Sequence, residues 1–286
     1  MVLFSSIFRF RDEKGSIYFG EAGESSNHTL ESLTGRSVPI FRGEHPWDDD
    51  FVLTEEQRNV AEVLCPLPRT PIFMCIGLNY KQHADEANMS YGDYPVVFTK
   101  PPDALAGPFE NIPINPACVS MDYEAELCLV LGKDCKNLTA DADFASYILG
   151  YTAGNDVSSR YWQMPERSGN QHGSAKSFDK FAPIGPVITS TSIISDVTEL
   201  TMECFVNGEK RQSTKLDDLI FDIPAILQHL SRGTTLRKGT VIMTGTPSGV
   251  AAFMKPPAWL KDGDVVQVRI DKIGSTRNRI SFELSP

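Results

Sequence analysis

Two glutamates, Glu124 and Glu126, stand two residues apart in the segment YEAELCLVL, whose pattern predicts a strand entering a core. Because side chains alternate along a strand, this spacing places both carboxylates on one face. Two like charges there are costly unless a positive charge lies between them, and a hard divalent cation with oxygen ligands meets that need. Asp156, in GNDVS, is a candidate third ligand. The same residues also suit a solvated edge strand and a turn.

His83 and Glu86 are spaced three apart in a segment with helical composition, so their side chains would be neighbours. A carboxylate beside an imidazole fixes its tautomer and raises its basicity, which would make a general base able to deprotonate water near neutral pH. A surface histidine with a helical glutamate partner has the same spacing. The pair is therefore a candidate catalytic dyad whose role the spacing alone leaves open.

Two further features could contact an anion. Lys176 lies in SAKSF, after a polar stretch, where a lysine is usually only a solvated loop residue. The loop TGTPSG (244–249) can offer backbone N–H groups and hydroxyls, although it lacks the lysine and spacing of a P-loop, and a tight turn is the plain alternative. The other histidines lack a carboxylate at a diagnostic spacing and are assigned structural or surface roles: His28, His45, His172 and His229.

The N-terminal region must fold separately from these candidates if CPLPRTP (65–71) is a linker. Residues 4–22 predict a hairpin around Lys14-Gly15. The pattern Thr54-Glu55-Glu56-Gln57 resembles a capping box and predicts a helix with Val60, Val63 and Leu64 on one face. We therefore expect a small domain at 1–70 and a larger one at 71–286.

The larger region is β-rich, with too few helices for a regular alternation of strands and helices. Apolar runs predict strands at 72–77 and 123–131, and two more strands near the C-terminus. Helices are expected at 79–88, where His83 and Glu86 lie, at 144–149 before Gly150, and at 221–232 before Gly233. The candidate residues thus fall on strand ends, one helix and several loops.

The charge composition of the chain limits the classes of partner that it can bind. The 286 residues carry 27 Lys and Arg against 37 Asp and Glu, giving a net charge of −10, which argues against general affinity for nucleic acid or an anionic membrane. The apolar and charged fractions are typical of a globular protein. We expect no transmembrane segment and no secretory signal, and hence an intracellular protein. The six cysteines have neither disulfide-framework nor zinc-site spacing.

Taken together, seven segments resemble the fumarylacetoacetate hydrolase family in sequence and order. They cover most of residues 72–286, and seven ordered blocks are far more specific than one motif. The blocks are CIGLNYKQHADE (75–86), VVFTKPPDALAGP (96–108), MDYEAELCLVLGK (121–133), GYTAGNDVSSRYWQ (150–163), AKSFDKFAPIGP (175–186), FVNGEKRQ (205–212) and VIMTGTPSGV (241–250).

The resemblance implies an α+β, β-rich fold: a mixed β-sandwich roll that forms a homodimer, with a variable small domain in front. It implies Mg²⁺ or Mn²⁺, or Ca²⁺ in a crystal, bound by Glu124, Glu126 and Asp156, a catalytic dyad of His83 and Glu86, and Lys176 as a further catalytic residue. Substrate-binding positions that match the family's blocks are Gln163, Arg160, Thr246 and Gly245. Residues 164–175 (MPERSGNQHGSA) differ from better-known members, so the substrate is the least defined property.

The activity that the resemblance implies is metal-dependent C–C bond cleavage in a 2-oxo or β-dicarbonyl acid. Hydrolysis of an acylpyruvate such as fumarylpyruvate or acetylpyruvate, and decarboxylation of oxaloacetate, would share one site. The alternative is an isomerase or hydratase of an unsaturated oxo-dicarboxylic acid, similar to 2-hydroxyhepta-2,4-diene-1,7-dioate isomerase. A binder without catalysis is disfavoured because every expected site residue is present. The partners expected are a small oxo-acid and a second copy of the chain, with no nucleic acid or membrane, in the cytoplasm or in mitochondria.

Overall fold

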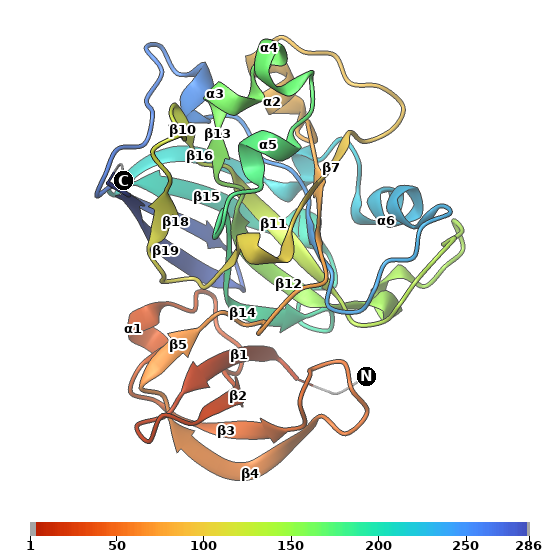
Figure 1. Ribbon diagram of the computed structural model, residues 1–286. Helices are drawn as coiled ribbons and strands as arrows, with labels where there is room; N and C mark the ends of the chain where they lie inside the picture. Colours follow the sequence, from red (N-terminus) through yellow and green to blue (C-terminus); the bar gives the residue numbers. More distant parts are fainter. Residues whose placement is uncertain (1–3, 285–286) are drawn as a thin grey trace.

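The computed structural model describes residues 4–284, and strands dominate it (Figure 1). The first five strands form the N-terminal part, below the rest of the molecule in Figure 1. These are β1 (Ser6–Arg11), β2 (Ile17–Glu21), β3 (Ser37–Arg42), β4 (Val52–Asn59) and β5 (Glu62–Leu64). The expected hairpin is confirmed, because β1 and β2 pair antiparallel. One short helix, α1 (Leu30–Leu33), begins after the capping residue Thr29.

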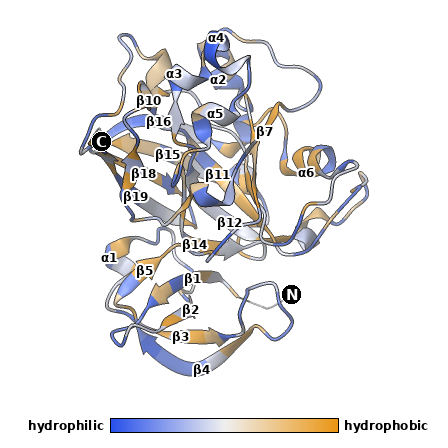
Figure 2. Ribbon diagram, viewed as in Figure 1, coloured by the Kyte–Doolittle hydropathy of each residue, from blue (hydrophilic) through white to orange (hydrophobic). Residues whose placement is uncertain are grey.

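The helix expected from Thr54 onward is wrong, because β4 and β5 occupy that segment. Side chains along β4 alternate between exposed and partly buried positions, as in a strand with one solvated face. Figure 2 shows β4 as largely hydrophilic beside the hydrophobic β3, with which it pairs. The capping-box pattern was misleading because pairing with β3 outweighs a local helical preference.

Ten strands form the main path of the large sheet, in the order β4-β3-β2-β1-β14-β12-β11-β17-β6-β7. The N-terminal strands join the others where β1 pairs with β14, with Ile7 opposite Ile188. The division into domains near residue 70 therefore stays a proposal. The added strands are β6 (Phe73–Ile76), β7 (Val97–Lys100), β11 (Ala125–Leu131), β12 (Ile148–Asn155), β14 (Ala182–Ser190) and β17 (Val241–Met243); β8 (Leu105–Ala106) pairs with β14.

A second sheet has the order β16-β15-β18-β19-β9. Its strands are β16 (Glu209–Lys215), β15 (Thr201–Val206), β18 (Val265–Ile270), β19 (Gly274–Phe282) and β9 (Ile112–Ile114). A short pair, β10 (Met121–Asp122) and β13 (Ser158–Ser159), lies beside it. The strands expected at 72–77, at 123–131 and near the C-terminus are confirmed in substance, with β11 beginning at Ala125.

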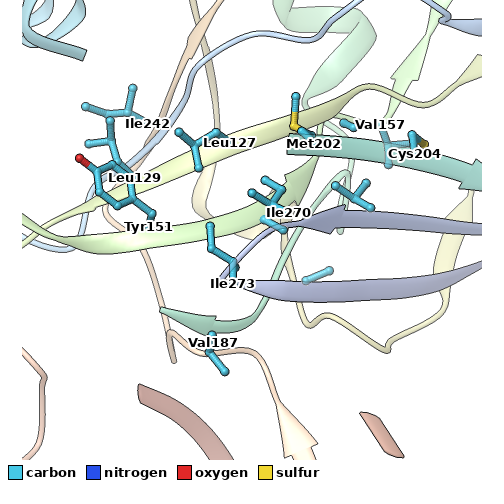
Figure 3. Packing of buried hydrophobic residues seen from close by; sticks show 14 of the residues in the cluster. Leu127, Leu129, Tyr151, Val157, Val187, Met202, Cys204, Ile242, Ile270 and Ile273 are labelled. Atoms are coloured by element: carbon cyan, nitrogen blue, oxygen red, sulfur yellow. The ribbon is translucent and has the colours of Figure 1, made fainter. Parts of the chain in front are cut away.

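The core lies between the two sheets. Figure 3 shows Leu127 and Leu129 of β11 among buried side chains that include Met202 of β15 and Ile270 of β18. Every residue of β11 and β12 is buried, which explains why β11 is apolar without interruption after Glu126. Burial of these strands on both faces fixes the positions of the residues at their ends, where the carboxylates lie.

Four helices gather at the upper end of the molecule in Figure 1, and α6 packs at one side. They are α2 (Lys81–Ala87), α3 (Arg160–Gln163), α4 (Pro165–Ser168) and α5 (Gly173–Lys176), with α6 (Ile223–Ser231). The helices expected at 79–88 and 221–232 are confirmed. The helix expected at 144–149 is wrong in extent, because a 3-10 turn (Phe144–Tyr147) passes directly into β12, which includes Gly150.

The state of the cysteines and the lengths of the helices can be compared with the expectations from the sequence. All six cysteines are free and buried, as expected for inert thiols. Among residues 4–284, no helix has the length and hydrophobicity that crossing a bilayer requires.

Candidate metal centre and active site

Three carboxylates meet where the start of β11 lies beside the end of β12. In this antiparallel pair Glu126 is opposite Gly154, and Asp156 directly follows β12. Glu124 directly precedes β11 rather than lying in it, but its carbonyl accepts a hydrogen bond from the Asp156 N–H at 2.9 Å. One carboxylate oxygen from each residue lies within 4.8 Å of the others, and all three residues are buried. We call Glu124, Glu126 and Asp156 the acidic triad.

Glu126 is the member of the triad that most needs a cation. Its Oε2 accepts a hydrogen bond from the Gly245 N–H at 2.7 Å, whereas its Oε1 is buried without a hydrogen-bond partner among residues 4–284. Burial, followed by the charges of Asp156 and Glu124, raises the pKa of Glu126 well above its ordinary value. An orphaned carboxylate oxygen beside two other carboxylates fits Mg²⁺ or Mn²⁺, which prefer oxygen ligands.

Two basic side chains contact Glu124 and its neighbours. Lys176 Nζ lies 2.8 Å from Glu124 Oε2 and 2.5 Å from Asp156 Oδ2. Arg160 Nη2 lies 2.6 Å from Glu124 Oε1, and Arg160 Nε donates to Asp122 Oδ2 at 2.8 Å. Although burial alone would raise it, the pKa of Glu124 is lowered by Lys176 and then Arg160. Burial likewise opposes the ammonium of Lys176, but Asp156 and Glu124 raise its pKa above the ordinary value.

Lys100 is a third basic residue of the site and was missed by the sequence reasoning. Its fully buried Nζ forms an ion pair with Asp156 and donates to the carbonyl oxygens of Val157, at 3.4 Å, and Phe181. The available signal was its position in β7, where it shares the inward face with Phe98. A lysine in register with a core phenylalanine needs a buried partner.

The formal charge of this buried cluster is −1, because it holds four carboxylates and three basic groups. A bound divalent cation would make it +1, which suits an anionic substrate. The cluster consists of Asp122, Glu124, Glu126, Asp156, Lys100, Arg160 and Lys176.

Replacing Lys100 by Met is expected to destabilise the protein by about 3–5 kcal/mol, because Asp156 would stay buried without one of its cations. Urea unfolding in EDTA measures the change. The control Lys180→Met breaks an exposed pair with Glu110 (2.7 Å), which is worth about 0–1 kcal/mol. Equal losses in the two variants would contradict a structural role for Lys100.

The dyad on α2 has the geometry that the spacing predicted. His83 Nδ1 lies 3.0 Å from Glu86 Oε2, and Glu86 Oε1 accepts a hydrogen bond from the Gly249 N–H at 2.9 Å. The His83 ring meets the edge of Phe253 at a centroid distance of 5.6 Å. With Nδ1 facing the carboxylate, Nε2 is the nitrogen left to exchange a proton.

The expected substrate-binding residues lie at different distances from the triad. Arg160 contacts Glu124 directly, and its Nη1 donates to Gln163 Oε1 at 2.7 Å. Gly245 uses its N–H for Glu126. Its φ of +101° and the 2.7 Å that would separate an added Cβ from Asn79 Cβ require glycine there. The site thus unites Arg160, Gln163 and Gly245 around the triad.

Thr246 joins the site through a second residue that the sequence reasoning did not single out. Gln212 Nε2 donates to the Thr246 hydroxyl at 2.8 Å, while Gln212 Oε1 accepts from the Ala125 N–H at 3.0 Å. The amide thereby ties the TGTPSG loop to the start of β11. No local pattern in FVNGEKRQ indicates this contact.

His172, to which a surface or structural role was assigned, contacts a residue of the candidate site. Its Nδ1 is 2.9 Å from Gln163 Nε2, and its ring lies against Phe98 at a centroid distance of 5.3 Å. Burial, and then the charge of Lys176, lowers the pKa of His172, so the neutral ring can accept from the Gln163 amide. His172 was missed because its partners are not at helical spacing.

Comparison with known proteins assigns the chain to a family. The model of the fumarylacetoacetate (FAA) hydrolase C-terminal domain matches residues 72–281. The mitochondrial oxaloacetate tautomerase Fahd2a of Rattus norvegicus is 37% identical over 267 residues, 93% of this chain and 80% of its own. The fumarylacetoacetate hydrolase domain-containing protein 2 homolog of Dictyostelium discoideum is 42% identical over 216 residues, 72% of this chain and 70% of its own.

Solved structures agree in fold. The 2-hydroxyhepta-2,4-diene-1,7-dioate isomerase of Mycobacterium marinum aligns with a TM-score of 0.81 and 29% identity, covering 98% of this chain and 100% of that one. A fumarylacetoacetate hydrolase of Exiguobacterium antarcticum aligns with a TM-score of 0.77 and 33% identity at the same coverage. The expected α+β, β-rich fold is confirmed. The chain belongs to the fumarylacetoacetate hydrolase family.

Proposed function

We propose that the protein is a divalent-metal-dependent enzyme that interconverts the keto and enol forms of a 2-oxo-dicarboxylic acid of the oxaloacetate class. The observation that carries the proposal is the unpartnered oxygen of Glu126 in a triad that also adjoins a histidine–glutamate dyad. Relatives named oxaloacetate tautomerases, similar over most of this chain, support the substrate class.

The acidic triad would hold Mg²⁺ or Mn²⁺, and Ca²⁺ would fit the same oxygen ligands. A bound divalent ion supplies Lewis acidity toward the 2-oxo-carboxylate end of the substrate. The formal charge of the buried cluster supports this assignment. A bound divalent cation changes that formal charge from −1 to +1, so that the cluster attracts a dicarboxylate.

The chain's own residues would then move the proton. His83 Nε2 would remove a proton from the carbon beside the 2-oxo group, while Glu86 holds the hydrogen on Nδ1. Lys176, whose ammonium is buried among the carboxylates, would donate a hydrogen bond to the oxygen on which charge develops. Return of the proton to that oxygen yields the enol, and its return to carbon yields the keto form.

Residues beside the acidic triad would bind the carboxylates of the substrate. Arg160 and Gln163 hold each other in place, so a guanidinium and an amide are presented together. The hydroxyl of Thr246, oriented by Gln212, would bind on the other side. These three roles follow the matched blocks of the family and the hydrogen bonds found here.

C–C bond cleavage is the second candidate. A dyad that can deprotonate carbon can also activate water, so an acylpyruvate would be hydrolysed at its distal carbonyl. Oxaloacetate needs no water to lose CO₂, so decarboxylation requires only stabilisation of the product enolate. Isomerisation of an unsaturated oxo-dicarboxylate uses the same proton transfer, and the similarity to the Mycobacterium marinum isomerase supports it as a third outcome.

Metal removal and product analysis decide between these reactions. Purified protein is incubated with enol and keto oxaloacetate, acetylpyruvate and an unsaturated oxo-dicarboxylate, each with Mg²⁺, Mn²⁺ or EDTA. We expect enol–keto exchange of oxaloacetate to be fastest with metal and to fall by about 10³-fold or more in EDTA. Mass analysis that finds pyruvate and CO₂, or acetate and pyruvate, at higher rates would favour cleavage instead. Activity unaffected by EDTA would refute metal dependence.

Assembly and location are proposals as well. We propose a homodimer, for which light scattering during size-exclusion chromatography should give twice the chain mass of 31.6 kDa. Several relatives are named mitochondrial, so we propose a mitochondrial location, with the cytoplasm as the alternative. Microscopy of the full chain with a C-terminal fluorescent tag distinguishes the two locations.

A further inference from the structure

We propose that the N-terminal part carries a second small-molecule site, which binds an organic anion with a flat apolar body. The site is a cavity of about 420 Å³ whose lining includes Arg9, Phe19, Phe41, Glu44, His45 and Arg69. Strands β1 to β3 and the approach to β6 build it, so it lies away from α3 and α5 (Figure 1), which carry the basic residues Arg160 and Lys176 that contact the acidic triad. The proposed activity leaves this cavity unused.

Arg9 supplies a positive charge that has no anionic partner within the described residues. The side chain is partly buried beside β5, and among residues 4–284 its single hydrogen bond goes to the Cys65 carbonyl at 3.4 Å. Burial lowers the pKa of Arg9, and neighbouring Arg11 lowers it further. A guanidinium stays protonated in proteins, so its charge must be stabilised by an acceptor. An oxyanion in the cavity would meet that need with two parallel hydrogen bonds.

His45 adds an unpaired nitrogen to the same cavity. Its Nδ1 is buried without a hydrogen-bond partner in the described part of the chain. Its ring stacks on Trp47 at a centroid distance of 5.1 Å, which fixes its plane. Glu44 is the acid nearest to the ring, with Oε1 3.5 Å from Nε2, but its side chain is 83% exposed and solvated. In the described part of the chain, Nδ1 and Arg9 are therefore two polar groups of this cavity without a partner, and Nδ1 would donate to an anion in the tautomer in which it carries the ring hydrogen.

The apolar walls define the rest of the ligand. Phe19 and Phe41 are buried, and Phe41 stacks on Phe51 at 4.7 Å with an angle of 8° between the rings, so this wall is rigid. The Tyr18 ring packs against Phe10 on the other face of β2 and is not part of this wall. Rigid aromatic walls favour a flat ring or conjugated chain, and Arg69 supplies a further, exposed cation for the same anion. A carboxylate or phosphate joined to a flat group satisfies all of these surfaces.

Isothermal titration calorimetry with benzoate, benzyl alcohol and inorganic phosphate tests the site. We expect benzoate to bind, and benzyl alcohol and phosphate to bind at least about tenfold more weakly, because each lacks one of the two recognised features. Arg9→Met should weaken benzoate binding by about tenfold or more, and Arg69→Ala by less. Turnover of the oxo-acid should be unchanged in both variants. The control Arg237→Ala, at an arginine 65% exposed and paired with Asp134, should behave as wild type.

Each other outcome overturns a part of the proposal or all of it. Benzoate binding that survives Arg9→Met, or is lost in Glu126→Gln, would place the ligand in the acidic triad's site. If benzyl alcohol bound as tightly as benzoate, the site would not require an anionic group. If phosphate bound as tightly as benzoate, the site would not require a flat apolar body. Should Arg9→Met fail to fold by circular dichroism, His45→Phe keeps the stacking on Trp47 and removes the ring nitrogens. Unchanged benzoate binding in His45→Phe would then refute the site.

Discussion

Glu126→Gln is expected to reduce metal-dependent turnover by about 10³-fold or more, because it removes a charged ligand without changing the size of the side chain. The same variant should not destabilise the metal-free protein. Burial and the neighbouring carboxylates oppose the ionised form of Glu126, so a neutral amide relieves repulsion. A loss of activity with retained or increased metal-free stability separates a metal ligand from a structural residue.

Thermal unfolding with and without metal measures this difference directly. At a metal concentration a hundredfold above Kd, binding should stabilise the wild type by about 2.7 kcal/mol, which for a chain of this size raises Tm by roughly 4–5 °C. Glu126→Gln should lose most of this shift. Glu62→Gln, at an exposed glutamate paired with Arg11, should keep it. A full metal-dependent shift in Glu126→Gln would contradict the assignment of the acidic triad.

The acidic triad could be predicted because its residues are specified by short sequence patterns. Two glutamates at strand spacing specify one face, and the GNDVS block supplies the third carboxylate in the family's order. Similarly, His83 and Glu86 are three apart, and a single helical turn is enough to bring them to 3.0 Å. Sequence spacing predicts contacts well when one regular element positions both partners.

Contacts between residues far apart in the sequence could not be predicted in this way. Lys100 and its partner Asp156 are 56 positions apart in the sequence. A lysine whose partner is not known is expected to be solvent-exposed. His172 meets Gln163 through a chain reversal formed by short helices, which no period describes. Pairing of β1 with β14 joins residues more than 180 positions apart. Long-range pairing of this kind depends on the whole fold, so a single sequence does not reveal it.

His83→Gln is expected to lower kcat for enol–keto exchange by about 10²–10⁴-fold, the usual contribution of a general base. The metal-dependent Tm shift should persist, because His83 is not a member of the triad. Hydrolysis of an acylpyruvate should fall with it, since both reactions need the imidazole. Some decarboxylation of oxaloacetate should remain, because loss of CO₂ needs no base. Equal loss of decarboxylation and hydrolysis would refute this division of roles.

Glu86→Gln separates orientation of the imidazole from the proton transfer itself. The amide can still accept from the Gly249 N–H, so α2 should stay in place, but the charge that stabilises protonated His83 is lost. We expect a decrease in kcat of about 10–10²-fold, smaller than for His83→Gln, with KM little changed. Stopped-flow assays across the pH range measure both constants. His229→Gln, at a histidine stacked on Tyr94 away from the dyad, is the matched control and should keep the wild-type profile. A Glu86→Gln loss as large as that of His83→Gln would instead make the carboxylate itself the proton acceptor.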